Sequence, residues 1–297
     1  MSTREYFYDL SDRGILSLNG LEQDDPWFVD FFYRRLAPTA NPMFPDYPFV
    51  SRCGDEMNYV KPADTPIVFT RMEQGRLFYG ISLSVPFNAA SLVYSPDGVL
   101  YHAAPVGERG RLVPALATEL GCHIEHWGPM YALHDPSTGV ATVIPPMTIP
   151  DGLHLLRPKE DNMCVGCGMA NPWSLRLSFV FDEGDGVVRT WLAPNERMNG
   201  AMETVHGGFV SLLLDETMGK SLSVRGIKAP TAQLNVRFRA PMMMHVQHEI
   251  RSWIERIDGR KNFLKGVICR ADDPDRVVAE ADALFITVRP ESIPQIV

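Results

Sequence analysis

One segment, residues 206–223, constrains the fold of this chain more than any other part of its sequence. It reads HGGFVSLLLDETMGKSLS, and apolar side chains would cover most of the circumference of a helix formed by it. A helix that is apolar nearly all round has to be buried. Asp215 stands inside this apolar run. Because a buried carboxylate is costly unless it is paired, hydrogen-bonded or protonated, we expect Asp215 to have a function.

Strand-like segments flank the expected helix. Residues 231–240 (TAQLNVRFRA) alternate between apolar and polar side chains, which predicts a strand with one buried face. Further strand-like runs occur at 175–181, 187–192, 246–257, 262–271 and 276–288. Two strands, one helix and then several strands are typical of an antiparallel sheet packed on a single helix, in the α+β class.

A proline-rich stretch, residues 143–160, predicts the connection between two domains. Its four prolines remove backbone donors and fix φ, so neither a helix nor a central strand suits it. We expect residues 1–150 to form an α+β domain followed by this linker, with helices over 25–36 and 111–120. Residues 151–297 are expected to form the second domain.

The charge and the cysteine content exclude several classes of protein. The net charge of −8 offers no basic field to attract nucleic acid. No apolar run approaches the ~18 residues of a membrane span, and the N-terminal residues lack the apolar core of a signal peptide. The five cysteines are an odd number, which does not suit a secreted disulfide framework. We therefore expect a cytoplasmic protein.

The glycines at the expected start of the helix, Gly207 and Gly208, are candidates for binding a carbonyl oxygen. Helix N-termini present unsatisfied N–H groups and a partial positive charge, and glycine lets another group come close. Such a site can stabilise an oxyanion. Asp215 would lie about 13 Å from His206 at 1.5 Å of rise per residue. A site that uses both the glycine amides and Asp215 would more naturally take them from two copies of the helix.

A recognisable motif starts at the helix N-terminus. It consists of His206-Gly207-Gly208, followed by six residues and then Asp215. In its surroundings it resembles the hotdog-fold thioesterase superfamily, closest to the phenylacetyl-CoA thioesterase-like (PaaI-like) branch. The likeness extends over residues 164–288 and includes CVGCGMANPWSLRLSF (164–179), TAQLNVRFRAP (231–241), DGRKNFLKGVICR (258–270) and VVAEADALFITV (277–288). It implies a C-terminal hotdog fold, an antiparallel sheet wrapped on a central helix.

The resemblance also implies residue roles within the motif. Asp215 corresponds to the acid that activates water or attacks the thioester, and Gly207 to the residue whose amide polarises the thioester carbonyl. His206 and Gly208 complete the motif, and we expect the histidine ring to orient the loop before the helix. Glu216 is the rival candidate for the catalytic acid.

Two more site residues follow from the resemblance. Thr231 corresponds to a hydroxyl at the start of the next strand that contacts the nucleophilic water. The family's asparagine position is occupied here by Gly200, so Asn199, one residue earlier, is the candidate. Because the family takes these groups from two subunits, a homodimer or higher oligomer is implied.

The function implied by the resemblance is that of an acyl-CoA thioesterase, a hydrolase that releases free acid and CoA without a cofactor. Two alternatives stay open. One is a non-catalytic acyl-CoA-binding sensor or scaffold that keeps the same pocket. The other is a hotdog acyl-thioester hydratase or dehydratase.

The close pair Cys164 and Cys167 raises the question of a metal. A structural zinc site needs four ligands, normally a second Cys or His pair at related spacing, and none follows here. A redox role would require a βαβ context, which the pattern does not suggest. The sequence therefore predicts no metal.

The N-terminal half carries a second resemblance. YFYDLSDRGILSL (6–18), FVDFFYRRLAPT (28–39), FVSRCGDEMNYVKPADTPIVF (49–69) and LYHAAP (100–105) are similar to an uncharacterised domain family with bacterial and mitochondrial members. This likeness implies no activity.

Overall fold

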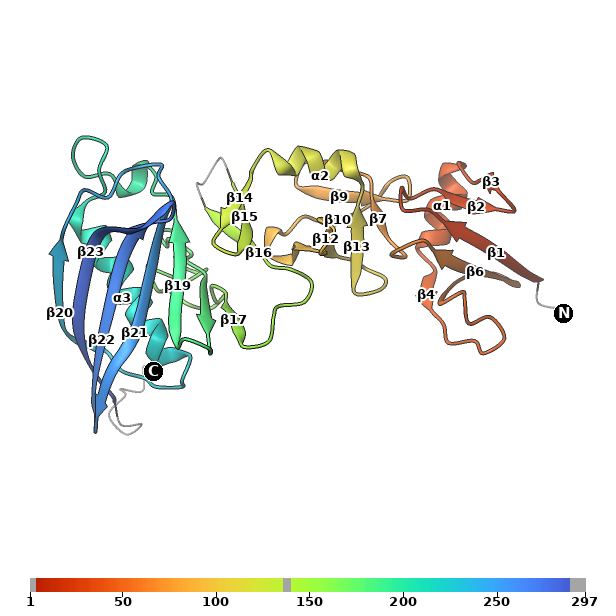
Figure 1. Ribbon diagram of the computed structural model, residues 1–297. Helices are drawn as coiled ribbons and strands as arrows, with labels where there is room; N and C mark the ends of the chain where they lie inside the picture. The colour runs from red at the N-terminus through yellow and green to blue at the C-terminus, as the bar shows by residue number, and fades with distance from the viewer. Residues whose placement is uncertain (1–3, 136–139, 289–297) are drawn as a thin grey trace. The chain divides into compact units, whose positions relative to one another are not determined.

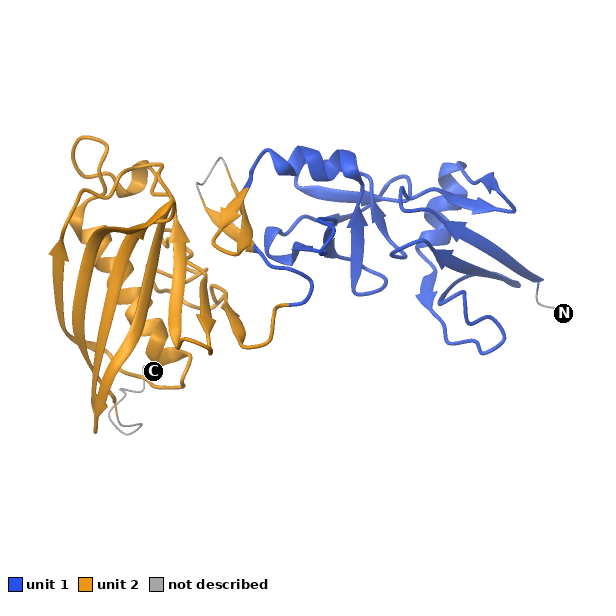
Figure 2. Cartoon of the chain, in the orientation of Figure 1, with its two compact units in different colours: residues 1–124, 144–148 blue, residues 125–143, 149–297 orange. Residues whose placement is uncertain are grey.

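The computed structural model describes residues 4–135 and 140–288 of the chain. They fall into two compact units (Figure 2). Unit 1 comprises Met1–Ile124 and Ile144–Thr148, and unit 2 comprises Glu125–Val143 and Ile149–Val297. Sheets dominate both units, and helices are few (Figure 1).

Unit 1 combines short sheets with two helices, as expected for an α+β domain. Helix α1 (Pro26–Tyr33) begins within the range expected for a helix, and the side chain of Asp25, its N-cap residue, accepts a hydrogen bond from the Phe28 amide. Helix α2 (Pro114–Gly121) also starts with a proline. The sheets have the strand orders β3-β2-β1-β6-β5-β4, β10-β9-β8 and β11-β12-β13-β7.

The strands of unit 1 are mostly short. Their bounds are β1 (Arg4–Leu10), β2 (Leu16–Leu18), β3 (Leu21–Glu22), β4 (Leu36–Pro38), β5 (Phe49–Cys53), β6 (Glu56–Pro62), β7 (Val68–Phe69), β8 (Arg71–Glu73), β9 (Arg76–Tyr79), β10 (Leu83–Pro86), β11 (Val93–Tyr94), β12 (Leu100–Ala103) and β13 (Arg109–Leu112), with the 3-10 turn η1 (Ala89–Ser91).

Unit 2 contains one large antiparallel sheet of order β17-β18-β19-β21-β22-β23-β20. Its strands are β17 (Leu153–Leu156), β18 (Phe179–Asp182), β19 (Val187–Leu192), β20 (Thr231–Phe238), β21 (His248–Asp258), β22 (Lys261–Arg270) and β23 (Asp273–Ile286). The 3-10 turn η2 (Glu196–Met198) and helix α3 (Gly207–Ser223) complete the unit. Figure 1 shows the long strands curving round α3, so the expected sheet on a single helix is confirmed.

Helix α3 packs against the sheet through its apolar residues. Leu213, Leu214 and Met218 have no exposed surface. On β22, Gly266 supplies no side chain where the helix comes closest. A Cβ there would lie 3.1 Å from Leu214 Cδ2 and 3.4 Å from Met218 Cγ. The absence of a side chain at this strand position therefore sets how closely helix and sheet approach.

A small sheet packs against the large one within unit 2. It consists of β14 (Ile124–Trp127), β15 (Met130–His134) and β16 (Ala141–Ile144). The Trp127 ring lies edge-on to Trp191 of β19 at 4.9 Å, and its Nε1 donates to the Trp191 carbonyl at 2.9 Å. The boundary expected near residue 150 assigns residues 125–143 to the first domain. In the structure residues 125–135 and 140–143 pack in unit 2, because their apolar side chains are covered by that sheet.

Strand β20 is less buried than its alternation predicts. Leu234 and Val236 are half-buried, whereas 57% of the Phe238 side chain is exposed. The strand is the edge of the sheet, next to β23 alone. One chain thus leaves the apolar face of β20 only partly covered. Among the helices described, none is long and apolar enough to cross a membrane.

Candidate active site

The start of α3 presents one free backbone donor. His206 is the N-cap residue, and its Nδ1 accepts a hydrogen bond of 3.0 Å from the Gly208 amide. The His206 carbonyl accepts from the amides of Phe209 and Val210. Within residues 4–135 and 140–288, no acceptor is found for the Gly207 amide. The imidazole therefore caps the helix and leaves the first N–H of α3 to a ligand.

A groove opens beside this amide. The groove is lined by Thr204, Val205, Gly207, Val210, Phe238, Arg239, Ala240, Pro241, Met242 and Val278. Most of these side chains are apolar, and the Phe238 ring lies 3.5 Å from the position that a Cβ on Gly207 would take. The groove thus places an apolar wall next to a helix N-terminus, an arrangement that suits a carbonyl compound with an apolar substituent.

Asp215 lies in the middle of α3 and is half-buried. The hydroxyl of Thr231, at the start of β20, donates to Asp215 Oδ1 at 2.7 Å. No hydrogen bond to Oδ2 is found among the described residues, so this second oxygen can accept a hydrogen bond from water. The structure brings together two candidates that lie sixteen positions apart in the sequence.

The amide and the carboxylate do not meet within one chain. Gly207 and Asp215 lie on the same helix, eight residues or about 12 Å apart at 1.5 Å of rise per residue. Asp215 is not among the residues that line the groove at Gly207. Each chain therefore carries two separate sets of polar groups.

Glu216, the rival acid, has a different environment. Its Oε1 lies 3.2 Å from Lys220 Nζ, and its Oε2 accepts a hydrogen bond from Cys164 Sγ at 3.3 Å. Both oxygens are thus engaged, whereas Asp215 keeps one free among the described residues. This difference favours Asp215 as the acid that acts on water.

Asn199 lies in the loop before α3 and is exposed. It forms an isolated β-bridge with Val205, and the amide of His206 donates to the carbonyl of Met198 beside it. No hydrogen bond among the described residues joins the Asn199 side chain to Asp215 or Thr231. The structure therefore places Asn199 near the helix start, and not at the carboxylate.

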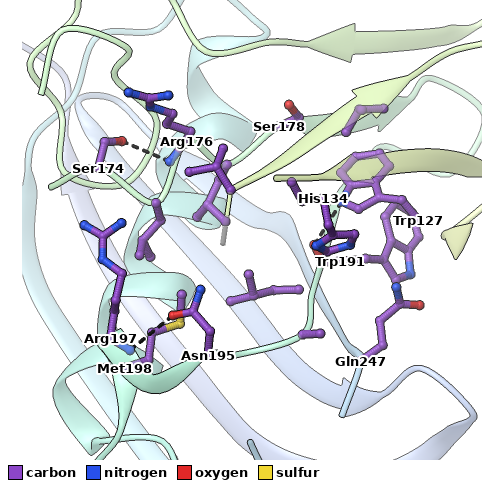
Figure 3. Close-up of a pocket in the computed structure, with 17 residues that line it drawn as sticks. Trp127, His134, Ser174, Arg176, Ser178, Trp191, Asn195, Arg197, Met198 and Gln247 are labelled. Carbon is purple, nitrogen blue, oxygen red and sulfur yellow. Dashed lines mark hydrogen bonds between the residues drawn. The ribbon is translucent and has the colours of Figure 1, made fainter. Parts of the chain in front are cut away.

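A second pocket of unit 2 contains none of the six predicted site residues. Figure 3 shows Trp127 and Trp191 on one side of it, with Arg176 and Arg197 on the other. Arg176 has a φ of 51°, in the left-handed region that is uncommon for residues other than glycine. Local sequence patterns give no signal for this pocket, because its walls come from separate parts of the chain: β14–β16, residues 174–178 before β18, and the end of β19 with the residues that follow it.

The two close cysteines form a cluster with α3. Cys164 Sγ, Cys167 Sγ and a carboxylate oxygen of Glu216 all lie within 4.8 Å of one another. Lys220 Nζ donates to Cys167 Sγ at 2.9 Å. Burial, followed by the hydrogen bond with Glu216, raises the pKa of Cys167 to about 12. Glu216 was not predicted as a third donor, because it lies 49 positions after Cys167 and belongs to no Cys or His pair.

The comparisons with known proteins agree with the resemblance expected from the sequence. Residues 202–277 match the family model of the thioesterase superfamily, and residues 1–132 match a domain of unknown function, DUF4505. The C-terminal region is thus similar to thioesterases, and the N-terminal region to an uncharacterised family, as predicted.

Several curated relatives carry the name acyl-coenzyme A thioesterase THEM4. The mouse protein is 33% identical over 94 residues, covering 32% of this chain and 40% of its own length. The protein from Xenopus laevis is 32% identical over 97 residues, covering 33% of this chain and 43% of its own. The chain thus matches about two fifths of the length of these relatives.

Among solved structures, the thioesterase superfamily protein RHA08564 is 27% identical to this chain. The superposition covers 42% of this chain and 60% of that protein, with a TM-score of 0.39.

Proposed function

We propose that unit 2 is a hotdog domain and that the protein hydrolyses an acyl-CoA thioester to a free acid and CoA. The match of residues 202–277 to the thioesterase superfamily supports this, together with the acyl-coenzyme A thioesterases among the relatives. The curved antiparallel sheet around α3 supports the fold assignment. The single observation that carries the proposal is the free Gly207 amide at the mouth of an apolar groove.

In the proposed reaction, the thioester carbonyl accepts a hydrogen bond from the Gly207 amide. The partial positive charge of the helix N-terminus stabilises the negative charge that develops on this oxygen. The acyl chain lies along the apolar wall that includes Phe238. A preorganised donor of this kind contributes about 2.7–4 kcal/mol to transition-state stabilisation in other hydrolases.

Asp215 supplies the other half of the chemistry. Its free oxygen takes a proton from the attacking water, or attacks the carbonyl itself to form an acyl-enzyme that water then hydrolyses. Thr231 orients the carboxylate through its hydrogen bond to Oδ1. The CoA thiolate leaves when the carbonyl re-forms.

The two halves come from different subunits in this proposal. About 12 Å of helix separates Gly207 from Asp215 within one chain. A two-fold dimer in which α3 of one protomer lies antiparallel to α3 of its partner would bring each amide to the partner's carboxylate. The half-covered apolar face of β20 is consistent with such a partner.

A direct assay tests the proposal. Purified protein is incubated with short, medium, long and aromatic acyl-CoAs, and the released thiol is measured. Asp215→Asn should lose most of the activity and keep its fold, whereas Asp258→Asn, a change of an exposed acid in the same unit, should keep it. Full activity in Asp215→Asn would show that the site is assigned wrongly.

The same assay separates the alternative functions. Binding of acyl-CoA with a rise in melting temperature but no thiol release would identify a sensor. Loss of an enoyl-CoA absorbance without thiol release would identify a hydratase.

A further inference from the structure

A group of sulfur and oxygen donors lies outside the proposed active site, between the loop 162–168 and helix α3. Cys164, Cys167 and Glu216 each present a donor atom, and these atoms lie within 4.8 Å of one another. The loop holds its two sulfurs in a fixed turn, since the Gly168 amide donates to the Cys164 carbonyl at 2.8 Å. The Gly166 amide points at Cys164 Sγ from 3.4 Å.

We propose that Cys164, Cys167 and Glu216 bind a thiophilic divalent cation such as Zn²⁺, which fastens the loop 162–168 to helix α3.

The donor set suits such an ion. Zinc prefers thiolate sulfur at about 2.3 Å and carboxylate oxygen at about 2.0–2.2 Å in a tetrahedron, and three protein ligands can leave the fourth position to water. Thiolates select soft metals over Mg²⁺ or Ca²⁺. Ligands of one tetrahedral zinc lie roughly 3.5–4 Å apart at these bond lengths, so donors that all lie within 4.8 Å of one another need to approach by at most about 1 Å.

The backbone of the loop comes unusually close to the carboxylate. A Cβ on Gly166 would lie 2.8 Å from both Cγ and Cδ of Glu216. A side chain at this position would push the Glu216 carboxylate away from the Cys-x-x-Cys turn. Glycine thus lets the third ligand lie beside the turn that carries the first two.

Lys220 completes the charge balance of the cluster. Its ammonium lies 2.9 Å from Cys167 Sγ and 3.2 Å from Glu216 Oε1. One divalent cation balances the charges of two metal-bound thiolates, and the opposite charges of Lys220 and Glu216 offset each other beside it. The long side chain of Lys220 can remain hydrogen-bonded to a metal-bound sulfur.

Metal titration of the full chain tests this site. The protein is reduced, stripped with a chelator and titrated with Zn²⁺ against a chromophoric competitor, and separately with Co²⁺. We expect one equivalent to bind tightly, with the thiolate-to-cobalt absorption in the near ultraviolet. Cys164→Ser, Cys167→Ser and Glu216→Gln should each weaken binding at least tenfold, whereas Cys122→Ser, a change of an exposed thiol outside the cluster, should not.

The outcomes that overturn the site are equally definite. Substoichiometric binding, or binding that survives in the Cys164→Ser/Cys167→Ser double variant, contradicts it. So does recovery of a Cys164–Cys167 disulfide in air together with no metal uptake by the reduced chain. If the cysteine variants do not fold, X-ray absorption of the zinc-loaded wild-type chain tests the site instead. Two sulfur neighbours of the zinc are expected, and any other number contradicts the site. These readouts do not depend on thioesterase activity.

Discussion

The Thr231 hydroxyl donates a hydrogen bond of 2.7 Å to Asp215 Oδ1, which links the first residue of β20 to the middle of α3. Helix and strand are thereby joined at the residue proposed to activate water. Because the bond occupies one carboxylate oxygen, it fixes the direction in which the other oxygen points.

We therefore predict that Thr231→Val lowers kcat/KM about ten- to a hundredfold, since a hydrogen bond to a charged group contributes about 1.5–3 kcal/mol. Thr231→Ser keeps the hydroxyl and should restore most of the activity. Steady-state kinetics on the best acyl-CoA substrate measure both. Full activity in Thr231→Val together with a loss in Thr231→Ser would mean that the threonine methyl group, and not the hydrogen bond, matters.

Mixed dimers should recover activity that two inactive variants lack. Gly207→Pro removes the free N–H, and proline is well tolerated at the first position of a helix. The preceding His206 already has the extended backbone that proline requires, with φ −60° and ψ 133°. Asp215→Asn removes the carboxylate. If the site lies between subunits, a hybrid carries one intact site.

Co-expression of the two variants with different affinity tags allows the hybrid to be purified. Random pairing should give about a quarter of the wild-type activity in the mixture, and each variant alone almost none. A hybrid as inactive as its parents would place both groups in the same site of one chain.

His206 should stabilise the helix through its ring nitrogen. We expect His206→Ala to lower the free energy of unfolding by about 1 kcal/mol, the usual contribution of an N-cap side chain. His206→Asn supplies another good cap and should recover the stability and most of any activity lost in the alanine variant. Chemical denaturation and the thiol-release assay give the two readouts. Activity lost in both variants, with stability restored by asparagine, would assign chemistry to the imidazole.

The contact between Gly266 and Leu214 predicts a packing defect. The methyl group of Gly266→Ala would press on Leu214 Cδ2, and overpacking of this kind costs about 1–3 kcal/mol. Leu214→Ala leaves a cavity that costs about 2–5 kcal/mol. Because the new methyl fills part of that cavity, the double variant should be more stable than the sum of the two losses predicts.

A matched glycine provides the control for this packing prediction. Gly219 lies within α3, and the methyl group added in Gly219→Ala would lie 3.9 Å from Phe285 Cε1, an ordinary van der Waals contact. Alanine is a better helix former than glycine, so this variant should be neutral or slightly stabilising. Additive losses in the Gly266 and Leu214 cycle would show that the two residues do not share the contact.

Buried His248 should make unit 2 less stable in acid. Its side chain is fully buried, and desolvation, followed by the charge of Arg270, lowers the pKa of His248 below its usual 6.5. Below that pH the unfolded chain binds a proton that the folded chain resists. This difference in proton binding therefore has no effect on the free energy of unfolding above pH 6.5. As the pH falls from there toward the lowered pKa, it destabilises the fold progressively.

Tryptophan fluorescence can follow this effect, since four of the five tryptophans lie in unit 2. Melting curves at about pH 7.5 and about pH 5.5 should differ less in His248→Asn than in the wild type. In the wild type, His248 Nδ1 lies 2.7 Å from the Val246 carbonyl oxygen, to which it is hydrogen-bonded. The side-chain amide of asparagine can donate to the same carbonyl. An equal acid-induced shift in variant and wild type would exclude His248 as the cause.

Several elements of unit 2 were predictable because their signals are local, whereas β17 (Leu153–Leu156) lies in the proline-rich stretch that was expected to be a linker. The apolar run of 206–223 specified α3 to within one residue, and the alternation at 187–192 gave β19 with its observed bounds. By contrast, a strand was expected to start at residue 175, but β18 begins only at Phe179. A short apolar run does not say where the pairing with a neighbouring strand starts.

The motif residues were likewise visible in sequence, but their partners were not. The sequence by itself determined the buried helix, its glycine start and the acid within it, because period and residue type act over a few turns. Only the tertiary structure decided that Thr231 meets Asp215, that Glu216 joins the two cysteines, and that residues 125–135 and 140–143 pack in unit 2. These contacts join positions far apart in the chain, where the closure of the sheet around α3 decides which side chains come together.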